Sequence, residues 1–242
     1  MNPSVIIRRR AVPLVALLAV TTLLLTLGAM LFNSRATAAA PASYNQGLTQ
    51  QHDGHGDLPS LQTAKQLAFH DQMRKLWEDH VTWTRMAIVT FADGSASFDA
   101  TAARLLQNQT DIGDAIKPYY GEAAGNALTA LLRDHITIAV ELMQAAKAGD
   151  TTTFESVKTR WYANGNDIAD FLSSANPRFW PQTEMRAAMT MHLDQTLAEA
   201  AHELGGDYPA GVADYDAIHL HILAMSDQLS SGIMQQFPGM FR

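Results

Sequence analysis

The 242-residue chain contains no cysteine, and this absence excludes two kinds of structure. Disulfide bonds cannot form, and no metal site can use a thiolate ligand. Any metal ion must therefore be held by histidine, methionine, carboxylate or amide side chains. The sequence also lacks alternating apolar stretches bounded by turn residues, so no β-strand is predicted and an all-α fold is expected.

Positive charge is scarce beyond the first 40 residues. The chain has 17 basic and 24 acidic residues, and residues 1–40 contain four of the arginines and no acidic residue. Residues 41–242 therefore hold 13 basic and 24 acidic side chains, a net charge of −11. Nucleic acids and anionic membrane surfaces bind positive faces, so neither is an expected partner of this part. Its acidic balance is compatible with binding cations.

The common enzyme signatures are also missing. The sequence has no Gly-rich phosphate loop, no GxSxG elbow and no HExxH motif. A four-helix di-iron site requires glutamate three residues before its histidines. The residues three positions before His80, His135 and His192 are Trp77, Leu132 and Met189. A ferritin-like oxidase is therefore disfavoured, and a protein without enzymatic activity is the better expectation.

One long apolar run lies near the N-terminus. Residues 11–32 carry no charge and follow Arg8, Arg9 and Arg10, which predicts export of everything beyond the run. The run is long enough to span a bilayer, which takes about 20 residues, but small residues at 36–40 offer cleavage sites. Residues 1–40 are therefore predicted to be an N-terminal membrane anchor or a cleaved signal peptide. The protein is expected to be extracytoplasmic, either anchored or secreted.

The remainder divides into a flexible linker, residues 41–60, and a single all-helical domain, residues 61–242. In the domain, apolar residues recur at intervals of three and four, and the interruptions are glycine or proline. The pattern predicts a bundle of six helices. Their expected spans are 62–92, 98–117, 122–148, 152–175, 182–204 and 209–236.

The domain also carries an internal repeat. Three histidines, each with a glycine 14 residues later, are followed beyond that glycine by an asparagine or histidine. The sets are His80, Gly94 and Asn108; His135, Gly149 and Asn164; and His192, Gly206 and His221. This register predicts three tandem antiparallel hairpins of about 56 residues, 61–120, 121–177 and 181–238. Because residues equidistant from a turn lie level, each histidine should face its partner near mid-helix.

The third hairpin differs from the other two because it places two histidines level with each other. Methionine and glutamate side chains share their helical faces. The candidate metal ligands are His192, His221, Glu199, Met189 and Met225, with His80 and His135 as further candidates. Histidine with methionine favours copper, whereas histidine with glutamate favours zinc or iron.

Two functional hypotheses remain open at this point. In the first, the exported bundle is a binding protein that holds a transition metal through its buried histidines. In the second, it is a non-catalytic structural or partner-binding platform. A buried imidazole opposite an amide then forms only a core hydrogen-bond pair that fixes the register of two helices.

Three segments carry a family resemblance. The strings LWEDHVTWTR, PYYGEAAGNALTALLRDHI and QFPGMF resemble those of a family of exported bacterial proteins of unknown function. The resemblance extends over residues 61–242. It implies a helical fold and an extracytoplasmic location in bacteria, and it brings no activity and no functional residue.

Overall fold

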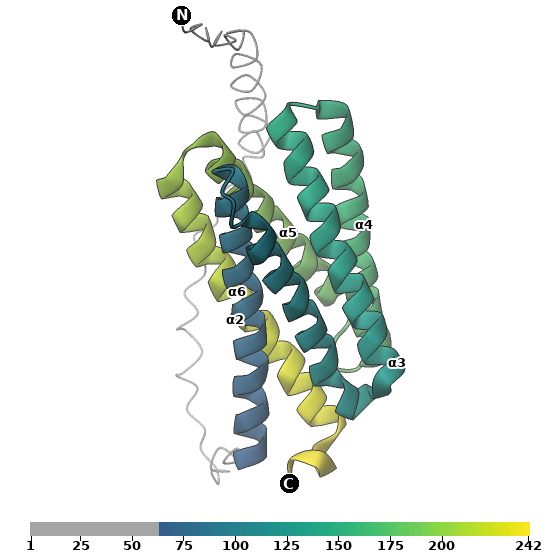
Figure 1. The fold of residues 1–242 in the computed structure, drawn as a ribbon. Coiled ribbons are helices and arrows are strands. Elements are labelled where there is room, and N and C mark those ends of the chain that lie inside the picture. The colour runs from purple at the N-terminus through teal and green to yellow at the C-terminus, as the bar shows by residue number, and fades with distance from the viewer. Residues whose placement is uncertain (1–62) are drawn as a thin grey trace, which may run out of the picture.

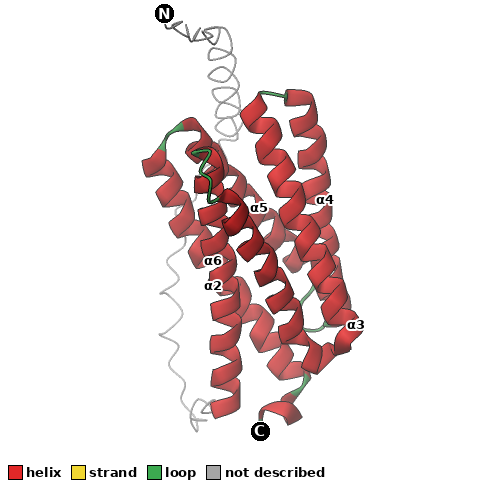
Figure 2. Ribbon diagram, in the orientation of Figure 1, coloured by secondary structure: helices red, strands yellow, loops and turns green. Residues whose placement is uncertain are grey.

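The computed structural model describes residues 63–242 and confirms that this part of the chain is all-helical, without strands (Figures 1 and 2). It contains five α-helices and a final 3-10 turn. These are α2 (Ala64–Ala92), α3 (Phe98–Ala148), α4 (Thr151–Ala175), α5 (Gln182–Gly205), α6 (Tyr208–Gln236) and η1 (Pro238–Phe241). The predicted anchor or signal and most of the predicted linker lie outside the described residues. Within 63–242, no helix has both the length and the apolar character needed to cross a membrane.

The count of helices differs from the expected six because two predicted helices join into α3. The helix continues through Pro118 and bends at Gly121, whose backbone angles are φ 84° and ψ 167°. This conformation is accessible almost only to glycine. The break therefore lies at the expected place in the sequence, but it changes the direction of the chain within one element instead of separating two.

The other helix ends follow local capping rules. Thr63 and Gln66 form a capping box at the start of α2, and the Asp150 and Asp207 side chains accept backbone hydrogen bonds at the starts of α4 and α6. The connections after α2, α3 and α5 each contain a glycine with positive φ. These short turns force the consecutive helical segments to lie antiparallel.

The helices pack side by side in an elongated bundle (Figure 1). α2 packs against α3 and α6, α4 packs against α3 and α5, and α5 packs against α6. Hydrogen bonds place the part of α3 before Gly121 against α2 and the part after it against α4. The helices surround a large apolar core, in which Trp161 and Trp180 are the largest fully buried side chains, and a smaller cluster of Ala87, Leu105 and Ile136 lies beside it.

Candidate functional site

Three buried histidines from three different helices come together inside the bundle. His80 of α2, His135 of α3 and His192 of α5 are each at most 4% exposed. The ring centroid of His192 lies 5.7 Å from that of His80 and 6.5 Å from that of His135. We call these three side chains the imidazole layer. The sequence analysis named all three as candidates, and the structure brings them together.

A small internal cavity of about 10 Å³ lies against the imidazole layer. Besides the three histidines, Met189 of α5 and Met225 of α6 line it, as predicted candidates from the third hairpin. The remaining lining is Trp77, Leu132, Ile168, Leu172 and Ile222. A volume of this size is close to the minimum that holds one water molecule. The cavity is therefore bordered by histidine and methionine side chains among apolar residues, and almost none of its surface is nitrogen or oxygen.

Three equivalent hydrogen bonds hold the helix pairs around this layer. In each, a side chain donates to the carbonyl of the residue four positions before a layer histidine. The bonds run from Asn108 Nδ2 to Leu76 O (2.9 Å), from Asn164 Nδ2 to Leu131 O (3.1 Å) and from His221 Nε2 to Ala188 O (3.0 Å). Each of these carbonyls also accepts a backbone hydrogen bond within its own helix. The additional side-chain bond links it to a neighbouring helix and so fixes the register between the two.

His221 therefore has the position of the two asparagines and is not a member of the imidazole layer. Its ring lies parallel to that of His192, with centroids 6.4 Å apart, and it does not line the cavity. The sequence analysis expected the metal candidates to gather in the third hairpin around His192 and His221. In the structure, the imidazole layer instead contains one histidine from each predicted hairpin, because all three side chains are buried close together in the interior.

The hydrogen bonds of His135 set its tautomer. Because Asn164 Nδ2 donates to the Leu131 carbonyl, its Oδ1 faces the imidazole and accepts a bond from His135 Nδ1 at 2.8 Å. In the neutral ring the proton is then on Nδ1, and Nε2 keeps a free lone pair. This is how a metal-binding histidine is normally oriented, with one nitrogen donating to the protein and the other available. The predicted pairing of His135 with Asn164 is confirmed.

His80 has a partner that the sequence analysis did not find. The Gln109 side-chain nitrogen donates to the Leu105 carbonyl at 2.8 Å and also contacts His80 Nδ1 at 3.2 Å. With the amide oriented this way, Nδ1 of His80 accepts and its neutral ring carries the proton on Nε2. Gln109 is fully buried, and the equivalent position of the second hairpin is Gly165. In the sequence, the only indication that the Gln109 side chain points inward is its position next to Asn108.

Burial keeps the imidazole layer neutral. It lowers the pKa of His80 to about 3, with a smaller effect from nearby His135, and lowers the pKa of His135 to about 4. Burial also lowers the pKa of His192 well below its ordinary value, and here the neighbouring histidines add to the effect. His192 Nδ1 is buried without a hydrogen-bond partner. Protons therefore compete weakly for these nitrogens near neutral pH.

Glu199 does not join the imidazole layer. It follows His192 by two helical turns, about 10 Å along α5, and its carboxylate lies 3.2 Å from Nη1 of Arg85. The same guanidinium reaches Glu203 at 2.9 Å. Burial raises the pKa of Glu199 to about 7, although Arg85 acts in the opposite direction. The predicted ligand is thus half of a buried ion pair, and pairing with Arg85 is a long-range contact that helical spacing does not reveal.

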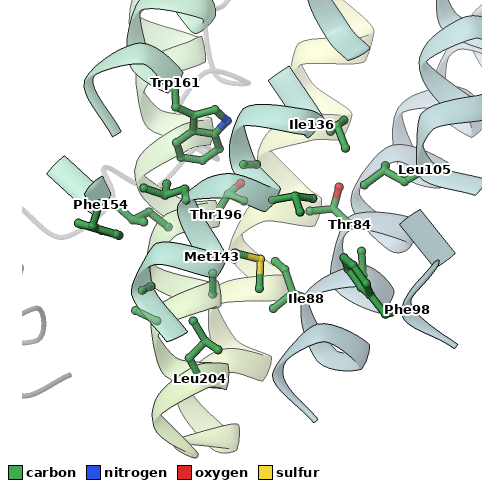
Figure 3. Close-up of a pocket in the computed structure, with 18 residues that line it drawn as sticks. Thr84, Ile88, Phe98, Leu105, Ile136, Met143, Phe154, Trp161, Thr196 and Leu204 are labelled. Carbon is green, nitrogen blue, oxygen red and sulfur yellow. The ribbon is translucent and has the colours of Figure 1, made fainter. Parts of the chain in front are cut away.

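A second and larger internal space adjoins the layer (Figure 3). It has a volume of about 70 Å³ and lies among α2, both parts of α3, α4 and α5. Apolar side chains such as Ile88, Phe98 and Met143 form nearly all of its wall (Figure 3). We call it the apolar chamber. The chamber gives no direct indication of function, because its wall has few polar groups that could bind a specific ligand.

The few polar groups of the chamber wall bond to the backbone of the imidazole layer. Thr84 Oγ1 donates to the His80 carbonyl at 2.7 Å, and Thr196 Oγ1 donates to the His192 carbonyl at 2.8 Å. The indole nitrogen of Trp161 lies 3.2 Å from the His135 carbonyl, and the indole stacks on that imidazole. Trp161 therefore separates the chamber from the layer and contacts both.

The arrangement of the layer falls short of a formed metal site. Within residues 63–242, no group of three or more histidine, aspartate or glutamate side chains has the geometry to hold a metal ion. The comparisons with protein-family models, curated proteins and solved structures found no match to this chain. The resemblance to exported bacterial proteins stays a prediction, and the functional argument depends on the imidazole layer itself.

Proposed function

We propose that this protein is an extracytoplasmic binding protein that holds one transition-metal ion in the imidazole layer. His135 Nε2 and His192 Nδ1 would be the nitrogen ligands, and Met189 and Met225 would lie beside them as thioether ligands. His80 would join them by shifting its proton from Nε2 to Nδ1, which gives up the contact from Gln109. The observation that carries the proposal is the meeting of three neutral, buried imidazoles at a cavity that two methionines also line. The exported location rests on the sequence of residues 1–40.

The distances between the rings are near those of a three-histidine metal site. With metal–nitrogen bonds of about 2.0–2.1 Å, three imidazoles around one ion place their ring centroids about 5.5 Å apart. The separation of His80 and His192 is 5.7 Å, and that of His135 and His192 is 6.5 Å. His135 would have to move about 1 Å closer to His192 for the two rings to share one ion. Such a movement is small for a side chain that borders a cavity.

Duplication would explain why each helix pair contributes one histidine. We infer that the three hairpins are copies of one unit, and the three equivalent bonds from Asn108, Asn164 and His221 support this. A single hairpin would carry one buried imidazole. Association of three such units would place three imidazoles at one level, which is the number that a transition-metal site commonly uses.

Elemental analysis of the full-length protein tests the proposal. The protein, purified without chelators or added metal, should retain close to one equivalent of copper, zinc or iron, and reconstitution with that metal should raise its Tm. His192→Gln should lose the metal. His202→Gln is the matched control, because His202 is also on α5 but its Nδ1 bonds to Asp214 at 2.6 Å. Absence of metal from the wild type, with no metal raising its Tm, would overturn the proposal.

A structural platform is the second candidate, and the hydrogen bonds around the layer favour it specifically. The bonds of Asn108, Asn164 and His221 fix helix register whether or not a metal binds. Under this function, His192→Gln would lower the free energy of unfolding and leave all metal titrations unchanged. The same set of variants therefore separates the two functions.

A further inference from the structure

We propose that the imidazole layer selects a soft monovalent ion, Cu(I), over divalent metal ions, because histidine and methionine side chains border its cavity and no carboxylate does. This inference rests on the proposed metal-binding function and specifies its ligand. The sequence alone left copper, zinc and iron open. Three features of the structure distinguish among them.

The first feature is charge. The lining residues that have a polar or sulfur atom in the side chain are the three histidines, the two methionines and Trp77, and none of them carries a charge near neutral pH. The nearest predicted acidic ligand, Glu199, is paired with Arg85, which also binds Glu203. An ion in the cavity would therefore keep its whole charge in apolar surroundings. The cost of burying an ion rises with the square of its charge, so a divalent ion is penalised about four times as much as a monovalent one.

The second feature is the type of ligand. Met189 and Met225 come from two different helices, α5 and α6, and both line the cavity beside the histidines. Thioether sulfur is a soft ligand that prefers Cu(I), whereas zinc and iron prefer imidazole with carboxylate or water. Methionine also fills gaps in apolar cores. Here the two thioethers border the same cavity as His192, whose Nδ1 is buried without a hydrogen-bond partner in the protein.

The third feature is volume. A divalent ion with three protein ligands usually keeps a water molecule or another group in a fourth position. The cavity measures about 10 Å³, close to the minimum for one small occupant. The space is suited to one small occupant, which leaves little room for a bound water beside an ion. Cu(I) accepts coordination by two or three soft or imidazole ligands without water, so its requirement matches the available space.

Competitive titration of the full-length protein tests this selectivity. Under anaerobic reducing conditions, Cu(I) would be delivered from a chromophoric chelator, and Ag(I) would serve as an air-stable monovalent probe. Zn(II) and Co(II) would be the divalent probes. We expect one equivalent of Cu(I) or Ag(I) to bind at least 100-fold more tightly than Zn(II) or Co(II), and His192→Gln to abolish this binding.

Methionine variants test the contribution of the thioethers. Met189→Leu with Met225→Leu conserves side-chain volume, so the fold should persist, while Cu(I) affinity should fall at least tenfold. Met185→Leu is the control, because Met185 is equally buried on α5 but does not line the cavity. The thermal unfolding of each metal-free variant reports separately on the fold.

The outcomes separate this inference from the proposed function. Binding of Zn(II) or Co(II) as tightly as Cu(I), lost in His192→Gln, would overturn the selectivity and leave the metal-binding function standing. If no ion binds in the wild type, both proposals fail. Equal Cu(I) affinity in the methionine double variant and in Met185→Leu would show that the thioethers are not ligands and would remove the second argument.

Discussion

The imidazole layer and the apolar chamber are neighbouring regions of one bundle, but their polar groups differ in whether they have hydrogen-bond partners. The chamber, about 70 Å³, uses the hydroxyls of Thr84 and Thr196 to bond backbone carbonyls. The cavity of the layer, about 10 Å³, is bordered by imidazoles, and one nitrogen of His192 is without a partner. The smaller space therefore has the greater capacity for specific binding, because lone pairs and not volume determine which ligand is recognised.

Trp161 lies between the chamber and the imidazole layer and contacts both of them. Trp161 packs against the chamber, stacks on His135 and bonds to its carbonyl. Trp161 thus lies between one imidazole of the layer and the larger apolar space. If this side chain is removed, the distinction between the two spaces should disappear.

Replacement of Trp161 should have the largest effect. Trp161→Ala removes a side chain that is 2% exposed and should lower the free energy of unfolding by about 3–5 kcal/mol, because it leaves a large cavity in the core. Urea unfolding followed by circular dichroism measures this loss. Trp83→Ala is the control, since Trp83 is only half-buried and should cost less. Equal losses in the two variants would contradict the role given to Trp161.

The pH dependence of stability should be the next largest effect. The pKa of a histidine in the unfolded chain is about 6.5, and burial lowers the pKa of His80 to about 3 and of His135 to about 4. Below pH 6.5 the unfolded state therefore binds more protons than the folded state. Stability is present above pH 6.5 and is lost as the pH falls toward 4, by up to about 1.4 kcal/mol per pH unit for each histidine.

Glu199 should act in the opposite direction. Burial raises its pKa from 4.5 to about 7, so its contribution is present below pH 4.5 and is lost as the pH rises toward 7. Urea unfolding at pH 7, 6 and 5 should show a net loss on acidification, because the histidines outnumber the glutamate. His135→Gln should flatten this dependence and Glu199→Gln should steepen it. A flat profile in the wild type would show that the imidazole layer is not buried in a neutral state.

Filling the chamber should have the smallest effect. Ala200→Leu adds apolar carbon to the chamber wall and should raise the free energy of unfolding by about 1 kcal/mol, since each buried CH₂ contributes about 0.8 kcal/mol against some strain. Chemical unfolding measures the change, and metal titration should be unaltered. Ala187→Leu, at an exposed position of the same helix, is the control. A loss of metal binding in Ala200→Leu would mean that the two spaces act as one site.

Local patterns in the sequence were sufficient to predict the helical class and most helix limits. Apolar spacing, the caps at Asp150 and Asp207 and the turn glycines act within a few residues, so local patterns were enough to predict them. The pairing of His135 with Asn164 was also predictable, because residues equidistant from a turn lie level. The extra helix in the prediction arose because Gly121 bends α3 and the pattern could not distinguish a bend from an end.

Which candidate residues meet in space depends on how the helices pack against one another. The rotation of each helix and the order of helices around the axis are set by packing between residues far apart in the chain, and local spacing contains neither. Packing therefore brings His80, His135 and His192 to one cavity and leaves His221 in a structural bond. Packing also places Arg85 against Glu199, because a buried carboxylate needs a charged partner. The candidate site is thus a property of the assembled bundle, although each of its histidines is visible in the sequence.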